Sequence, residues 1–99
     1  MPAKSKPVSP GEILREEFLR PLKISQNQLA RALEVPVGRI NDIIHARRSI
    51  TADTATRLGI YFRTGPEVWL NLQAQYEARL ARRRYLPQLS RRIRPRAAA

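Results

Sequence analysis

Three polar side chains near the middle of the chain have the chemistry to recognise the edges of nucleic-acid bases. Arg39, Asn41 and Asp42 carry a guanidinium, an amide and a carboxylate. In a major groove, a guanidinium pairs with O6 and N7 of guanine, an amide with adenine, and a carboxylate with N4 of cytosine. Just before them, Val37 offers a contact to a thymine methyl group, and Gly38 allows close approach of the backbone. The alternative is that these residues form an ordinary solvated helix face.

Five further side chains suit the phosphate backbone of the same nucleic acid. Gln26 and Asn27 are expected at a helix N-terminus, where backbone N–H groups and the helix dipole favour an anion. Arg31 lies on the same segment, and Arg47 and Arg48 follow the base-reading segment. Each neutralised phosphate should change the slope of log K against log salt by about −0.9. Ordinary surface charge is the alternative interpretation.

Catalysis and metal binding find no support in the residue types. The chain has no cysteine and a single histidine, His45, so donors for a zinc site are lacking. The acids Glu12, Glu16 and Glu17 cluster near a helix start and are typical of solvated charge. No nucleophile is paired with a base, and no glycine-rich loop suits a phosphate. We therefore expect no enzyme activity, no cofactor and no metal.

The elements that must position these residues are helices. Ser9, Ser25 and Thr64 each begin a capping box with Glu or Gln three residues later, and Pro36 suits the start of the base-reading helix. Pro21 should end the first helix, because proline lacks an N–H. Apolar residues recur at helical spacing, and strand-like alternation is absent. The five predicted helices span residues 9–20, 25–33, 36–45, 51–62 and 64–81, which gives an all-α fold.

The second and third of these helices have the pattern of a helix-turn-helix. Ala30 stands at the fifth position of the first helix, where a small residue lets the two helices pack closely. Val35 supplies the apolar residue of the turn, and Ile40 and Ile43 give the second helix its buried side. The N-terminal residues of the second helix should then reach base edges. This helix, residues 36–45, is the expected recognition helix.

Four sequence blocks together resemble the HigA family of antitoxins, a branch of the lambda-repressor-like helix-turn-helix proteins. The resemblance covers about residues 9–78. Its blocks are PGEILREEFL at Pro10–Leu19, RINDII at Arg39–Ile44, ITADTATRL at Ile50–Leu58 and WLNLQ at Trp69–Gln73. It implies a five-helix lambda-repressor-like domain in a bacterial toxin–antitoxin module. The implied partners are a HigB/RelE-like toxin that cleaves mRNA on the ribosome, and the double-stranded operator DNA of its own operon.

Three features depart from that family pattern. Ala46 stands where the family often has glycine after the recognition helix. Gly59 replaces a more usual alanine and should weaken its helix by about 0.5–1 kcal/mol. The basic extension after Arg82 is not part of the family core.

The last predicted helix carries an apolar stripe that belongs either to the core or to a dimer seam. Trp69 suits the core best, whereas the rest of the stripe favours a dimer contact. A two-fold dimer would place two recognition helices roughly 34 Å apart and predicts a palindromic operator. The candidate dimer residues are Trp69, Leu72, Gln73, Tyr76 and Leu80.

The chain divides by composition into a short N-terminal segment, one domain and a basic tail. Residues 1–8 should be disordered, residues 9–81 form the domain, and residues 82–99 form an Arg-rich tail in which order should end near Pro87. The net charge is +11, and residues 79–99 contribute eight arginines and no acid. Such a tail suits DNA, RNA or an acidic protein surface, or it is merely solvated. No apolar run reaches the roughly 18 residues of a membrane span.

The expected function is that of an antitoxin that neutralises its toxin and, as a homodimer, represses its own operon. We expect it in the bacterial cytoplasm, associated with the nucleoid when bound to its operator, and without membrane contact. Two alternatives stay open. One is a solitary transcriptional repressor without a toxin, and the other is a toxin-binding protein that has lost sequence-specific DNA binding.

Overall fold

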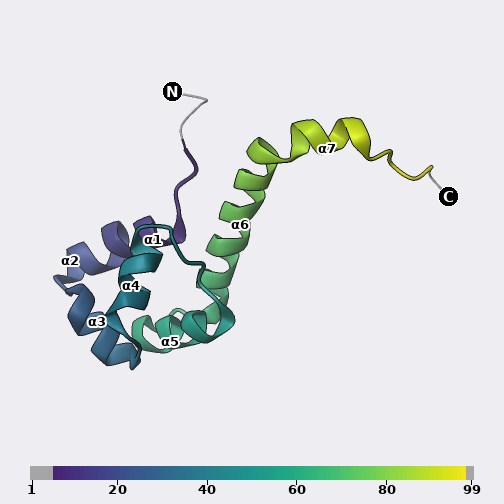
Figure 1. Cartoon of the computed structure of the whole chain (residues 1–99). Helices are drawn as coiled ribbons and strands as arrows, with labels where there is room; N and C mark the ends of the chain where they lie inside the picture. Colours follow the sequence, from purple (N-terminus) through teal and green to yellow (C-terminus); the bar gives the residue numbers. More distant parts are fainter. Residues whose placement is uncertain (1–5, 98–99) are drawn as a thin grey trace.

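The computed structural model describes residues 6–97, and within them every regular element is helical (Figure 1). The first three elements run without a break from residue 10 to residue 22. With them counted as one helix, this range contains six helices, one more than the sequence predicted. The elements are α1 (Pro10–Ile13), η1 (Leu14–Leu19), α2 (Arg20–Leu22), α3 (Gln26–Leu33), α4 (Val37–Ile44), α5 (Ala52–Phe62), α6 (Pro66–Arg84) and α7 (Leu86–Arg92).

The first helix passes through Pro21, so the prediction that this proline ends it is wrong. Its start is as expected, because the Ser9 hydroxyl accepts the Glu12 backbone N–H at 3.2 Å. The middle segment, η1, is a π-helix whose last turn bonds the Arg20 N–H to the carbonyl five residues back. The backbone hydrogen bonds are therefore already of the wider π-helical type just before Pro21, a residue that has no N–H to donate. The helix ends at Lys23, whose φ of 56° is left-handed.

The helix-turn-helix is formed by α3 and α4. Ser25 and Gln28 make the predicted capping box, with bonds of 3.0 and 2.8 Å between side chain and backbone. Glu34 adopts a left-handed φ of 59° and turns the chain, and Pro36 then precedes the first residue of α4. Ala30 is buried as expected, and its carbonyl accepts the Val35 N–H at 3.0 Å. This turn fixes α4 against α3 at the exposed edge of the domain.

One core unites α1 to α6. Its buried apolar side chains come from η1, α3, α4, α5 and α6 and include Leu14, Leu29, Ile40, Leu58 and Trp69. At one end of the core, the rings of three aromatic residues gather with centroid distances of 4.8–6.1 Å. They are Phe18, Phe62 and Trp69. This core is what holds the recognition helix in place on the domain.

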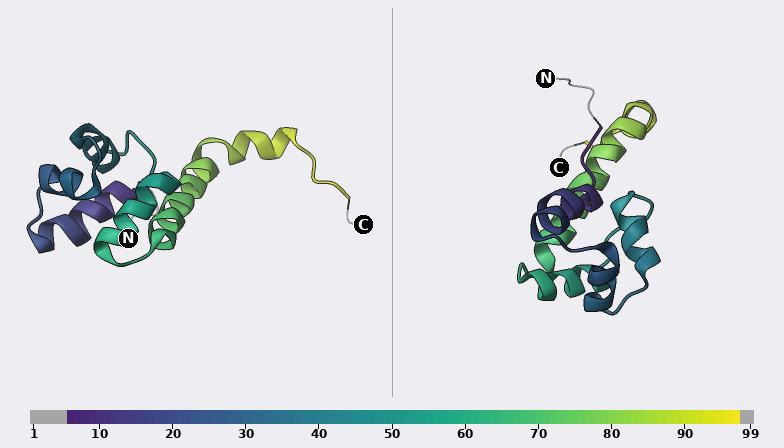
Figure 2. Two further views of the ribbon diagram at one scale, coloured as in Figure 1. Left: turned by 90° about the horizontal axis from the view of Figure 1, so that it is seen from below. Right: turned by 90° about the vertical axis from the view of Figure 1, so that its left-hand side faces the viewer.

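The C-terminal part forms an arm that leaves the body. The long helix α6 rises from the core, and α7 turns away at its end, on the opposite side of α6 from α3 (Figures 1 and 2). The prediction that order ends near Pro87 is wrong, because α7 continues to Arg92. Pro87 occupies the first turn of α7, where no backbone N–H is needed. No residue of α7 is buried.

Two of the departures from the family pattern have clear structural reasons. Ala46 adopts a left-handed φ of 59°, a conformation that favours glycine. Gly59 packs against the next turn so closely that a Cβ would lie 2.4 Å from the carbonyl carbon of Gly65. The prediction that Gly59 merely weakens its helix is therefore wrong, because an alanine would collide with backbone.

The N-terminal prediction falls largely on residues 1–5, which lie outside the described residues. Residues 6–8 form no regular element. Within residues 6–97 no helix has the length and apolar character needed to cross a bilayer. The same range contains no group of three side chains suited to hold a metal ion.

Candidate nucleic-acid interface

The start of α3 and the solvent side of α4 are joined by a hydrogen-bond chain of four predicted site residues. The Asn41 amide N–H donates to Oε1 of Gln26 at 3.1 Å. The Asn41 amide oxygen accepts Nη2 of Arg47 at 2.7 Å. The Nε of Arg47 also donates to Oδ1 of Asp42 at 3.2 Å. The structure thus brings together residues that the sequence places up to 21 positions apart.

These hydrogen bonds limit which donors and acceptors of each side chain are left for a base or a phosphate. The oxygen of Asn41 already accepts a bond from Arg47, so only its second lone pair is open for a bidentate contact with adenine. Asp42 forms an ion pair with Arg47 and neutralises part of its charge. This geometry suits a role of Asp42 in orienting Arg47 better than a role in recognising cytosine. Arg47 is half exposed and held by two acceptors. A cation fixed in this way beside the recognition helix suits a phosphate.

Arg39 lies in a second network, which reaches from α4 to α5. Its Nη1 donates to Oδ2 of Asp53 at 3.1 Å, and Nε of Arg57 donates to the same oxygen at 3.1 Å. Arg57 in turn donates through Nη1 to the backbone carbonyl of Leu33 at 2.8 Å. That carbonyl belongs to the C-terminal turn of α3, where helix carbonyls lack helical partners. One exposed carboxylate therefore links the recognition helix, α5 and the end of α3.

The Asp53 carboxylate is held in its charged form. The hydrogen bond from Arg57 is the largest cause that lowers the pKa of Asp53 below its ordinary value. Desolvation opposes it, and the positive charges of Arg57 and Arg39 lower the pKa further. Asp53 also lies in the first turn of α5, where a negative charge is favoured by the helix dipole. The network is consequently intact at neutral pH.

The start of α4 presents little side-chain bulk. Val37 is 43 % exposed, and apart from the adjoining residues and helix backbone no atom lies within 4 Å of the position where a Cβ of Gly38 would stand. The surface around Gly38 is therefore open, as close approach of a backbone requires. Of the remaining predicted contacts, three are exposed on the same two helices and the loop that follows them: Asn27, Arg31 and Arg48.

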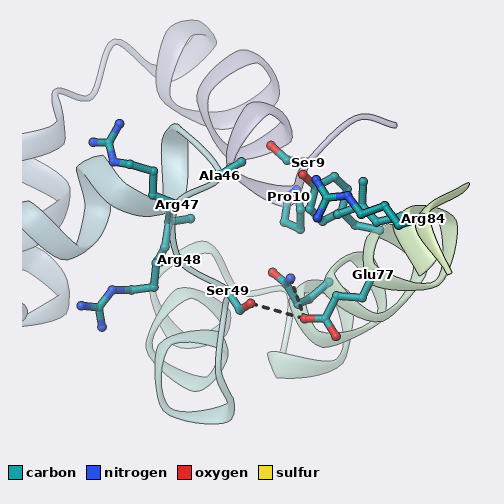
Figure 3. Close-up of a pocket in the computed structure, with 13 residues that line it drawn as sticks. Ser9, Pro10, Ala46, Arg47, Arg48, Ser49, Glu77 and Arg84 are labelled. Carbon is teal, nitrogen blue, oxygen red and sulfur yellow. Dashed lines mark hydrogen bonds between the residues drawn. The ribbon is translucent and has the colours of Figure 1, made fainter. Parts of the chain in front are cut away.

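The loop after α4, which carries Arg47 and Arg48, is held by hydrogen bonds to α4. The His45 ring Nδ1 lies 2.9 Å from the Asn41 carbonyl, and the Arg47 backbone N–H bonds to the Asp42 carbonyl at 2.8 Å. Arg47 and Arg48 border the neighbouring cleft, and Figure 3 shows their guanidinium groups directed away from α6.

Two of the five predicted dimer residues are buried and form hydrogen bonds within their own protomer. Trp69 is fully buried, and its indole N–H donates to the Thr64 hydroxyl at 3.0 Å. Gln73 is buried, and its Oε1 accepts the backbone N–H of Ile50 at 2.8 Å. Trp69 therefore belongs to the core, as the sequence favoured, and Gln73, which is 8 % exposed, has little surface to offer a partner. The helical spacing alone could not distinguish the two faces of α6.

The other three dimer candidates retain exposed surface on α6. Leu72 packs partly against the core. Tyr76 and Leu80 are half-buried and line a cleft of about 210 Å³ between the start of α1, the loop after α4 and α6 (Figure 3). Within the cleft, Oε2 of Glu77 accepts bonds from the Ser49 hydroxyl at 3.3 Å and the Gln73 amide at 3.0 Å.

The sequence did not identify two features of this surface. The first is the ion pair of Asp53 and Arg57, which the sequence did not predict as a site although an acid four residues before an arginine is a recognisable helical ion pair. The second feature is an apolar patch at the joint of α6 and α7. Its exposed side chains are Tyr85, Leu86, Leu89 and Ile93.

Comparison with known proteins places this geometry among DNA-binding regulators. Residues 14–69 match the family model described as helix-turn-helix. Virulence-associated protein I of Dichelobacter nodosus is 50 % identical over 74 residues, which cover 75 % of this chain and 68 % of that protein. Antitoxin HigA-1 of Vibrio cholerae is 37 % identical over 82 residues, 83 % of this chain and 77 % of the relative. The structure of Pseudomonas aeruginosa antitoxin HigA with the higBA promoter superposes with a TM-score of 0.87 and 46 % identity, covering 90 % of this chain and 97 % of the other.

Proposed function

The chain belongs to the HigA family of helix-turn-helix antitoxins, and on that basis we propose that it represses its own operon and neutralises a toxin encoded beside it. It is a DNA-binding regulator and not an enzyme, in keeping with its relatives. The observation that carries the proposal is the pair of side-chain networks on the exposed side of α3 and α4. These networks order Arg39 and Arg47 next to α4, the helix that enters the major groove in a helix-turn-helix.

The proposed DNA contacts divide into base and phosphate contacts. Arg39 is the principal base reader, because one edge of its guanidinium is not engaged by Asp53. Val37 and Gly38 allow α4 to enter the groove closely. The phosphate contacts come from the start of α3 and from both sides of the recognition helix: Gln26, Asn27, Arg31, Arg47 and Arg48. Asn41 and Asp42 act mainly by holding Arg47.

The proposed biological unit on DNA is a homodimer. Leu72, Tyr76 and Leu80 on α6 are its candidate seam, since all three keep partly exposed surface. The apolar patch at the joint of α6 and α7 provides additional apolar area of the kind that dimer interfaces cover. A two-fold dimer predicts a palindromic operator with half-sites about one helical turn apart. Light scattering of the free protein and of Leu80→Arg tests the seam, and a monomeric wild type contradicts it.

The arm contributes non-specific affinity in this proposal. Residues 79–97 contain eight arginines and no acid, and each phosphate that they neutralise adds about 0.9 to the magnitude of the salt slope. Deletion of residues 82–99 should flatten the slope of log K against log salt and leave the ratio of operator to random DNA affinity unchanged. An unchanged slope would remove the arm from the DNA interface.

The proposed toxin is a HigB/RelE-like protein that cleaves mRNA. Co-expression of this chain with the adjacent gene, followed by copurification and a growth-rescue assay, tests that pairing. Growth arrest by the neighbour alone and rescue by this chain are expected. If the neighbour is harmless, the chain is a solitary repressor.

Sequence-specific DNA binding is tested by a mobility-shift titration with Arg39→Ala. The matched control is Arg79→Ala, which removes an exposed arginine from α6 at a distance from α4. Arg39→Ala should weaken operator binding by about 10- to 100-fold, because a good bidentate contact contributes about 1–3 kcal/mol of discrimination. Equal behaviour of the two variants would leave a toxin-binding protein without sequence reading as the better account.

A further inference from the structure

We propose that Asp53 is a positioning residue for base reading, whose carboxylate on α5 holds the Arg39 guanidinium at the start of α4 in one orientation. By this means it raises the ratio of operator affinity to random DNA affinity. The inference rests on the proposed DNA-binding function and deepens it, because it names a residue outside the helix-turn-helix that decides specificity.

The geometry of the ion pair suits this role. Asp53 engages Arg39 through Nη1 alone, at 3.1 Å. The other two guanidinium nitrogens, Nε and Nη2, lie outside this ion pair and form the edge that a bidentate contact to guanine uses. The Arg39 side chain is 29 % exposed, so it is partly covered and still reachable from solvent. A carboxylate on one nitrogen therefore orients the rest of the group without consuming it.

The carboxylate is itself fixed with respect to the helix-turn-helix. Arg57 bonds to the same Oδ2 atom at 3.1 Å and to the Leu33 and Glu34 carbonyls at 2.8 and 3.5 Å. These carbonyls lie in the turn between α3 and α4. Asp53 is thereby tied to the backbone that sets the direction of α4. The hydrogen bond from Arg57 also keeps the pKa of Asp53 low, so the carboxylate stays ionised.

Two opposing effects on DNA affinity follow from this arrangement. A negative charge next to the interface repels the phosphate backbone and lowers affinity for any DNA. An arginine that is ordered before binding loses less conformational entropy when it meets the correct base, which favours the operator selectively. Asp53 should therefore reduce non-specific binding and increase discrimination. A residue that only stabilised the fold would change both affinities in the same direction.

The test compares two DNA duplexes of equal length and composition, one from the promoter of the chain's own operon and one scrambled. Fluorescence anisotropy at one salt concentration gives the dissociation constant of each. For Asp53→Asn we expect tighter binding of the scrambled duplex and an affinity ratio about tenfold lower than that of the wild type. Glu67→Gln is the control, because it removes the same charge from the first turn of another helix, α6. It should leave the ratio unchanged.

A double-variant cycle establishes that Asp53 acts through Arg39. In an Arg39→Ala background, Asp53→Asn should no longer change the affinity ratio. Asp53→Glu keeps the charge and should restore most of the ratio. Thermal unfolding of each variant shows that the fold is retained, and Asp53→Ser serves as the neutral variant if Asp53→Asn is poorly folded.

The outcomes separate this inference from the proposed function. An unchanged ratio in Asp53→Asn, or an equal loss of affinity for both duplexes, overturns the role of Asp53 and leaves operator binding standing. A persistent effect of Asp53→Asn in the Arg39→Ala background also overturns it. If the wild type does not distinguish the two duplexes, the proposed function and the inference both fail.

Discussion

Replacing Gly59 by alanine sets helix propensity against packing. Gly59 lies within α5, where alanine is preferred to glycine by about 1 kcal/mol. A Cβ at this position would stand 2.4 Å from C and 2.6 Å from O of Gly65, and 2.7 Å from N of Pro66. These are backbone atoms that cannot rotate away, so the overpacking cost should reach about 3 kcal/mol. The net expectation is a loss of about 2 kcal/mol in the free energy of unfolding.

Urea denaturation and thermal unfolding measure this loss, which should lower the Tm by about 10 °C in a domain of this size. Gly38→Ala is the matched control, since it lies in α4 with open space around its Cβ. That variant should be more stable by about 0.5–1 kcal/mol. The packing argument is refuted if Gly59→Ala is as stable as the wild type or more so.

Three further predictions concern stability. Ala46→Gly should stabilise the fold by about 0.5–1 kcal/mol in urea denaturation, because φ at Ala46 is 59°; a loss of stability would contradict the left-handed assignment. Gln73→Leu should cost about 1–3 kcal/mol, because the buried Ile50 N–H loses its acceptor, and a neutral effect in thermal unfolding would show that this bond is dispensable. The pKa of Asp53 is lowered from its ordinary value of 3.8. Its ion pairs therefore stabilise the fold fully above pH 3.8, and this contribution is lost as the pH falls through the pKa of the folded state. The stability difference between wild type and Asp53→Asn should therefore shrink below pH 3.8, and a difference independent of pH would argue against the ion pair with Arg57.

Sequence patterns were sufficient for five of the six helices and for the helix-turn-helix motif. Caps at Ser9 and Ser25 mark helix starts because side-chain oxygens there satisfy N–H groups that the helix leaves open. Ala30 and Val35 indicate the tight turn because only small or apolar residues fit between two closely packed helices. These are local requirements, so they are visible within a few residues of sequence. They failed at Pro21 and Pro87, where a widened turn and a helix start accommodate the proline.

The tertiary structure decided which residues the polar side chains bond to within the protein. Base-reading chemistry could be assigned to Arg39 from its type and place, but its ion pair with Asp53 joins residues 14 positions apart on different helices. The same holds for Gln73, which spacing alone placed on a dimer face and which the fold uses to accept the Ile50 N–H. Gly59 is the clearest case, since local propensity favours alanine while packing against Gly65 excludes it. Sequence by itself determined five of the six helical segments and the helix-turn-helix motif, because those properties depend on neighbours along the chain. Only the tertiary structure decided which of the polar groups are bound to each other before DNA arrives, because hydrogen bonds depend on distances in space.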